Sequence, residues 1–218
     1  MPTVLSTRIL SDAHRQLLNT SVVRWMEKDF IAIQPQEFTV DTVRDLVVFT
    51  SQNAVKSVLN NPHAQRLKTR PAICVGVKTK ALLEEHGWEV KAWTHYAKEL
   101  TAVIERDFFN CSFSFCCGNI RRETLPTFFK KHNLVFDEYE AYQTVKQPHA
   151  LQNKVDGICF YSPSAIESFL QNNQITTEVC FCIGDTTADA LNGITQQIVV
   201  ASQPTIEATL LACLAYYK

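Results

Sequence analysis

The chain has 218 residues, of which 46% are hydrophobic and 20% charged, and its formal net charge at pH 7 is -1. This composition excludes the disordered and fibrous classes, and the near-zero charge excludes a global field that attracts nucleic acid or a membrane surface. The start of the sequence has no secretory pattern, and no apolar run reaches the roughly 20 residues that span a bilayer, so we expect a cytoplasmic protein.

The predicted elements alternate between strand and helix from the start of the chain. We expect a strand over 4–10, a helix over 12–27 and a strand over 30–33. A second series with the same order is predicted as a strand over 113–117, a helix over 122–132 and a strand over 135–144. The order resembles the front of two copies of one α/β unit.

An internal repeat supports this interpretation. Residues 47–59 resemble residues 158–170 with an offset of 111, and residues 74–79 resemble residues 182–187 with an offset of 108. Each copy continues as strand, helix, strand, helix, strand, helix. The alternative is a chance likeness of two generic strand-helix pairs. The repeat favours an α/β fold with two parallel-sheet domains, whose strand ends would form a cleft for a ligand.

The eight cysteines do not form a zinc or redox motif, because no Cys-x-x-Cys spacing occurs. Cys180 and Cys182 alternate along an apolar run, which predicts two thiols on one face of a strand. We expect reduced core thiols and neither a metal nor a cofactor. The Gly-rich phosphate loops are missing as well, which argues against nucleotide binding through such loops.

Four predicted strand-to-helix turns carry hydroxyl or amide side chains: 50–53, 76–79, 162–164 and 184–187. Helix starts offer free backbone N–H groups and a partial positive charge, which can bind carboxylates. The alternative is helix capping alone, and both Ser164 with Glu167 and Thr186 with Asp189 have the capping-box spacing. The candidate substrate-binding residues in these turns are Thr50, Ser51, Asn53, Lys78, Thr79, Ser162, Ser164, Gly184, Thr186 and Thr187.

A fifth turn, residues 117–123, contains Arg121 and Arg122, and Arg122 is a further candidate for binding carboxylates. The alternative is a solvated helix start. Tyr142 is the candidate catalytic residue, because a positioned phenol can donate a proton. The alternative for Tyr142 is packing within a strand.

The motifs at 117–126, 142–144, 160–164, 183–191, 201–208 and 50–55 together resemble those of the uroporphyrinogen-III synthase family. The resemblance covers roughly residues 45–210. It implies two α/β domains, one formed by about 1–36 plus 147–218 and the other by about 40–143, with connectors near 34–40 and 142–148.

The resemblance also implies the chemistry. Members of the family convert hydroxymethylbilane to uroporphyrinogen III, losing water and inverting ring D through a spiro intermediate, without a metal or cofactor. A tyrosine matching Tyr142 has been considered as the proton donor, and residues matching Ser51, Thr79, Ser162 and Thr186 or Thr187 line the cleft. We expect a monomer whose partner is this small molecule, with no nucleic acid and no membrane.

Two departures concern the first loop: Ile9 stands where proline is usual, and the glycine that commonly ends the first helix is absent near Lys28. Two other functions stay open. A binding module with the same two-domain fold could bind a tetrapyrrole or another polyanion without turnover. The second alternative function is that of a two-lobed solute-binding protein, although such a protein normally needs a signal peptide and an oxidising compartment.

Overall fold

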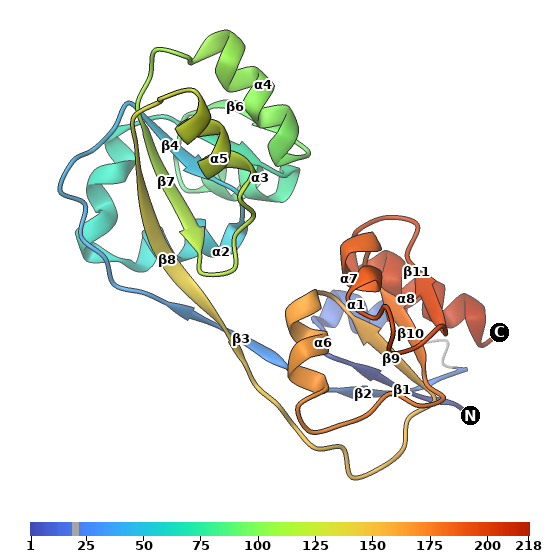
Figure 1. The fold of residues 1–218 in the computed structure, drawn as a ribbon. Helices are drawn as coiled ribbons and strands as arrows, with labels where there is room; N and C mark the ends of the chain where they lie inside the picture. The colour runs from blue at the N-terminus through green and yellow to red at the C-terminus, as the bar shows by residue number, and fades with distance from the viewer. Residues whose placement is uncertain (19–21) are drawn as a thin grey trace. The chain divides into compact units, whose positions relative to one another are not determined.

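The computed structural model of the protein describes residues 1–18 and 22–218. The chain forms two compact units: one comprises Met1–Ala32 and Val145–Lys218, and the other comprises Ile33–Thr144. Each unit has its own sheet (Figure 1). The prediction of an α/β fold with parallel sheets is confirmed.

The unit formed by residues 33–144 has a six-stranded sheet with the strand order β3-β8-β7-β4-β5-β6. The four pairs β8-β7, β7-β4, β4-β5 and β5-β6 are parallel. The elements in chain order are β3 (Ile31–Pro35), β4 (Leu46–Phe49), α2 (Gln52–Asn60), the 3-10 helix η1 (Pro62–Thr69), β5 (Ala72–Val75), α3 (Val77–Glu85), β6 (Val90–Thr94), α4 (Ala97–Asp107), β7 (Phe113–Gly118), α5 (Thr124–Lys131) and β8 (Phe136–Lys146).

The other unit has a five-stranded parallel sheet with the order β11-β10-β9-β1-β2. Its elements are β1 (Thr3–Ser6), α1 (Asp12–Leu17), β2 (Arg24–Glu27), β9 (Gly157–Phe160), α6 (Pro163–Phe169), β10 (Val179–Cys182), α7 (Asp185–Asp189), β11 (Ile198–Val200) and α8 (Ile206–Tyr216). The series β4-α2-β5-α3-β6-α4 and β9-α6-β10-α7-β11-α8 follow the predicted repeat.

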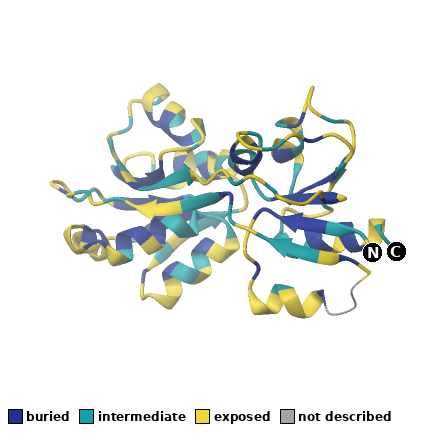
Figure 2. Ribbon diagram, turned by 90° about the horizontal axis from the view of Figure 1, so that it is seen from below, coloured by how far each residue is buried: buried dark blue, intermediate teal, exposed yellow. Residues whose placement is uncertain are grey.

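Both faces of each central strand are buried, as expected for parallel sheets with helices on both sides. In β4, Val47 and Phe49 join one apolar core, whereas Leu46 and Val48 join the other, with Leu100 and Ile104 of α4. Figure 2 shows the burial pattern: the inner strands are mostly buried, and the helices expose their outer faces. Cys180 and Cys182 lie together in one core, and the eight cysteines are free thiols.

Strands β3 and β8 carry the chain between the units. Gln36 N–H donates to the carbonyl of Ala141 at 2.9 Å, and Gln147 N–H donates to the carbonyl of Phe30 at 2.9 Å. The partner number falls as the residue number rises, so the two segments run antiparallel. Among the described residues, no helix combines the length and the apolar character needed to cross a membrane.

The predicted helix over 12–27 is wrong in its second half. Helix α1 ends at Leu17, and Arg24–Glu27 form β2, which pairs in parallel with β1; residues 19–21 of the predicted helix lie outside the described part. The segment Val22-Val23-Arg24-Trp25 is rich in β-branched and aromatic residues, which favour a strand once a partner strand is beside them.

Candidate functional site

The carboxyl ends of β4, β5 and β7 meet at one edge of their sheet, because these strands run parallel. A pocket of about 270 Å³ opens at this edge. Buried Phe115 and Leu125 contribute apolar surface to its wall, whereas Ser51 and the arginines contribute polar groups. The lining residues are Thr50, Ser51, Val75, His95, Tyr96, Ala97, Phe115, Gly118, Ile120, Arg121, Arg122, Leu125 and Tyr142.

Tyr142 reaches this pocket from β8. Its hydroxyl oxygen lies 3.1 Å from Ser51 Oγ, and either oxygen can be the donor. Ser51 is also the N-cap of α2, where its Oγ accepts from the backbone N–H of Ala54 at 3.2 Å. The phenol is therefore linked through one serine to the amino terminus of a helix, the end with the partial positive charge.

The backbone around Tyr142 is fixed by Asn119, which directly follows β7. Asn119 N–H donates to the carbonyl of Tyr142 at 3.2 Å, and Asn119 Oδ1 accepts from the backbone N–H of Thr144 at 2.9 Å. The register of β7 and β8 shifts between Cys117 and Gly118, which is a bulge. Bulges change the direction in which the following side chain points.

Arg121 is held by two carboxylates. Its Nη2 donates to Glu138 Oε2 at 3.1 Å, and its Nη1 forms an ion pair with Glu123. These hydrogen bonds, first to Glu138 and then to Glu123, raise the pKa of Arg121 above its ordinary value. Arg121 is thus a fixed cation in the wall of the pocket, and Arg122 lies beside it at an exposed position.

The loop between β6 and α4 closes another side of the pocket. The Glu99 carboxylate accepts from the backbone N–H of His95 at 3.0 Å and from that of Tyr96 at 3.2 Å, which fixes the loop. Cys117 is close by on β7, but burial raises the pKa of its thiol to about 12, so the thiolate nucleophile is absent at neutral pH.

The structure brings together part of the predicted set. Thr50, Ser51, Arg122 and Tyr142 line the pocket. Three other candidates of the same unit lie outside its lining: Asn53 in the first turn of α2, and Lys78 and Thr79 in the first turn of α3. Thr79 is buried at the start of α3, with 4% of its surface exposed.

The remaining candidates belong to the other unit, at the carboxyl ends of β9 and β10. Ser162 is the N-cap of α6 and accepts from Ala165 N–H at 3.2 Å, whereas Ser164 lies within the first turn. Gly184 is the N-cap of α7 and makes no side-chain cap. Thr186 is exposed and Thr187 is 3% exposed.

The predicted capping boxes of Ser164 with Glu167 and of Thr186 with Asp189 are wrong. Pro163 occupies the first helical position of α6, where its missing N–H costs nothing, so the cap falls on Ser162. In α7 the cap falls on Gly184, ahead of both threonines.

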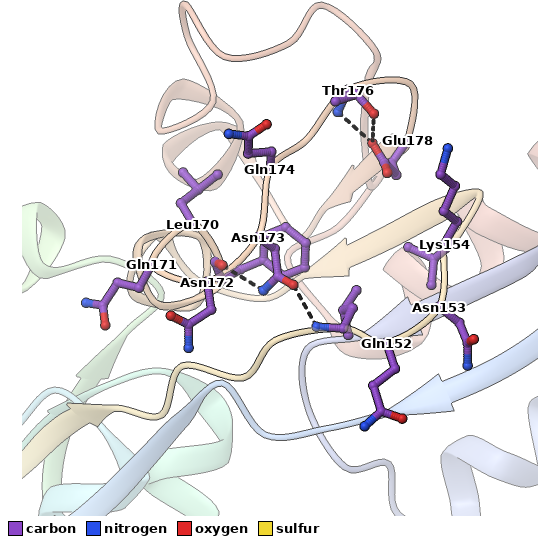
Figure 3. A pocket seen from close by; sticks show the side chains of 13 residues that line it. Gln152, Asn153, Lys154, Leu170, Gln171, Asn172, Asn173, Gln174, Thr176 and Glu178 are labelled. Atoms are coloured by element: carbon purple, nitrogen blue, oxygen red, sulfur yellow. Dashed lines mark hydrogen bonds between the residues drawn. The ribbon is translucent and has the colours of Figure 1, made fainter.

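A second pocket, of about 600 Å³, lies at the amino ends of β9 and β10 (Figure 3). Some of its polar groups hold the loops together. Asn173 Nδ2 donates to the carbonyls of His149 and Phe169, Asn173 Oδ1 accepts from Leu151 N–H, and the Glu178 carboxylate accepts from the N–H and hydroxyl of Thr176. The described lining of this pocket consists of apolar, amide, Lys, Thr and Glu side chains, whereas the pocket beside Tyr142 has tyrosine, histidine and arginine side chains.

His95, Tyr96 and the packing of Gly118 against Tyr142 were not among the predicted features of the site. The loop at 94–97 is also a strand-to-helix turn at the carboxyl end of a strand, so the same rule would have found it. In the described part of the chain, no cluster of three or more His, Cys, Asp or Glu side chains has an arrangement that holds a metal ion.

Two α/β units, each with a mainly parallel sheet, define a two-domain α/β protein, and Tyr142 reaches a pocket in one of them from β8. The model of the family of uroporphyrinogen-III synthase HemD matches residues 26–210. The chain therefore belongs to the uroporphyrinogen-III synthase family.

Solved structures have the same fold. The chain is similar to uroporphyrinogen-III synthetase from Helicobacter pylori, with 20% identity, a TM-score of 0.76 and coverage of 99% of this chain and 100% of that one. It is also similar to a mutant uroporphyrinogen III synthase from the extremely thermophilic bacterium Thermus thermophilus, with 14% identity, a TM-score of 0.65 and coverage of 99% and 98%. The search of curated proteins by sequence gives no match.

Proposed function

We propose that this chain converts hydroxymethylbilane to uroporphyrinogen III with inversion of ring D, as a cyclising lyase of tetrapyrrole biosynthesis, and that Tyr142 is its proton donor. The family match supports the reaction. The observation that supports the role of Tyr142 is its hydroxyl in the pocket wall, 3.1 Å from the helix-capping Ser51.

The hydrogen bonds of Ser51 suit a donor role for the phenol. Because Ser51 Oγ accepts from Ala54 N–H, the serine proton is available for the oxygen of Tyr142. The phenol proton then points to the substrate. As the C–O bond of the bilane breaks with its electron pair on oxygen, this proton converts the departing hydroxyl to water. The phenolate takes back a proton that the ring-closing step releases.

The eight carboxylates of the bilane would be shared among helix starts and cations. In the unit of Tyr142, we assign this role to Thr50, Ser51, Asn53, Lys78, Thr79 and Arg122. In the other unit, we assign it to Ser162, Ser164, Gly184, Thr186 and Thr187. Backbone N–H groups at helix starts would supply most of the contacts, because the side chains of Ser51 and Ser162 already cap their helices.

Orientation is the larger part of this catalysis. The bilane closes unaided to the isomer without inversion, so the enzyme must hold the chain ends until the substituted carbon of ring D reacts. Positioning of this kind contributes on the order of 7–11 kcal/mol in good cases. One proton donor contributes typically about 10²–10⁴-fold. We further propose that the protein acts as a monomer in the cytoplasm, without nucleic acid as a partner.

The test is incubation with freshly prepared hydroxymethylbilane, followed by separation of the type I and type III isomers. We expect wild type to give the type III isomer. Tyr142→Phe should lower kcat by about 10- to 1,000-fold, at the weaker end of general-acid effects because this hydroxyl leaves readily. The fraction of type I isomer should rise as uncaptured bilane closes alone.

Tyr139→Phe is the matched control, since Tyr139 lies on the same strand and its hydroxyl donates to the carbonyl of Thr42 at 3.1 Å, outside the pocket. It should keep wild-type turnover. A wild-type protein that binds the bilane and leaves the isomer ratio unchanged would establish the non-catalytic binding module instead. Full turnover by folded Tyr142→Phe would reduce Tyr142 to a packing residue.

A further inference from the structure

We propose that Gly118 is a positioning residue for Tyr142: its missing side chain leaves the space in which the phenol ring lies. This inference rests on the proposed function, because it says that Tyr142 can donate its proton only if residue 118 has no side chain. Gly118 is buried at the end of β7 and lines the pocket.

The present position of the Tyr142 ring requires glycine at position 118 for space. A Cβ atom built on Gly118 would lie 2.5 Å from Tyr142 Cζ, 2.6 Å from Cε2 and 2.9 Å from the hydroxyl oxygen. Ordinary contacts between carbon atoms are about 3.5–4.0 Å, so the ring would have to move by roughly 1 Å. The backbone of Gly118 does not require glycine, because among the described glycines positive φ angles occur at Gly76, Gly87 and Gly193.

A displacement of this size would break the hydrogen bond of the ring to Ser51, now 3.1 Å long. Gly118 and Tyr142 are direct partners across the bulge, and Asn119 binds the carbonyl of Tyr142 and the N–H of Thr144, whereas Gln36 N–H donates to the carbonyl of Ala141 on the other side. With the backbone fixed, a methyl group on Gly118 would push the ring outward about its χ angles. The hydroxyl, now 3.1 Å from Ser51 Oγ, would leave its place. A displacement of about 1 Å can cost about 10²-fold in rate.

A set of variants separates this role from a general packing defect. Gly118→Ala is measured in wild type, in Tyr142→Phe, which keeps the ring, and in Tyr142→Ala, which removes it. Gly157→Ala is the matched control: Gly157 begins β9, and a Cβ there would lie 2.8 Å from the hydroxyl oxygen of another tyrosine, Tyr217, outside the pocket of Tyr142. The measurements are thermal melting, kcat, KM and the isomer ratio.

In wild type, Gly118→Ala should lower Tm by about 3–10 °C, as overpacking does. It should lower kcat by about 10- to 1,000-fold, to the level of Tyr142→Phe, with KM within about twofold. In Tyr142→Phe, it should lower Tm but leave kcat unchanged, because no hydroxyl remains to be displaced. In Tyr142→Ala, it should leave Tm unchanged. Gly157→Ala should lower Tm and keep the wild-type isomer ratio.

Thermal melting tests the packing of Gly118 against Tyr142 and needs no enzymatic activity. It therefore shows whether the ring needs the space at Gly118 even if wild type does not form uroporphyrinogen III. If Gly118→Ala does not fold alone, Gly118→Ala/Tyr142→Ala must restore folding. An equal loss of Tm in the wild-type and Tyr142→Ala backgrounds would overturn the proposal. A further loss of kcat in Tyr142→Phe would overturn it too, because the added methyl would then act on the substrate directly.

Discussion

The hydrogen bond between Ser51 and Tyr142 can be measured against an internal reference that the repeat supplies. Ser51 and Ser162 are N-caps at corresponding positions of the two copies, and both accept from the N–H three residues on at 3.2 Å. The extra contact to a tyrosine hydroxyl belongs to Ser51. The losses of stability caused by Ser51→Ala and Ser162→Ala should therefore differ by the contribution of that contact.

Loss of a serine N-cap costs about 1 kcal/mol of unfolding free energy. A hydrogen bond between two neutral hydroxyl groups contributes about 0.5–1.5 kcal/mol net. We expect Ser162→Ala to destabilise its unit by about 1 kcal/mol and Ser51→Ala to destabilise its own unit by about 2 kcal/mol. In the Tyr142→Phe background, Ser51→Ala should cost only the cap, about 1 kcal/mol.

The assay is urea unfolding followed by circular dichroism, with separate transitions fitted if the units unfold separately. The double-mutant cycle of Ser51 and Tyr142 gives the coupling directly. Activity is measured on the same proteins, and Ser51→Ala should lower kcat in wild type but not in Tyr142→Phe. Equal costs of Ser51→Ala in the two backgrounds would refute this reasoning and leave Ser51 as a cap alone.

Three further predictions concern charge and thiols. Hydrogen bonds from the Ser112 hydroxyl and N–H lower the pKa of Asp45. The stabilisation from Asp45 should therefore be fully present above the ordinary aspartate pKa and be lost as the pH falls through the lower pKa of the folded state. Asp45→Asn should flatten that part of the curve of unfolding free energy against pH. Glu138→Gln should destabilise the protein by about 0.5–1 kcal/mol in urea unfolding, because Arg121 loses one of its two charged partners and keeps Glu123. An unchanged midpoint would contradict this. Cys111 is half-buried whereas the other seven cysteines are buried, so iodoacetamide should label it first at about pH 8, and mass spectrometry that finds another cysteine labelled first would refute the burial argument.

Local patterns were enough to predict the class of the fold. Buried parallel strands such as β4 and β9 are short continuous apolar runs, and each is followed by a polar turn and a helix. Because the two copies preserve this order, the repeat also indicated two sheets. The helix predicted through residues 24–27 failed, since pairing with β1 decides that segment and a distant strand leaves no local signal.

The residue types of the candidate site could be predicted, but only some of its residues could. Polar turns at strand ends identified Ser51, and the family motif identified Tyr142. The sequence by itself determined which groups stand at strand ends, because that depends on chain order and periodicity. Only the tertiary structure decided that the Tyr142 ring lies over Gly118 and that its hydroxyl meets Ser51, since a bulge between β7 and β8 and residues 91 positions apart in sequence create that contact.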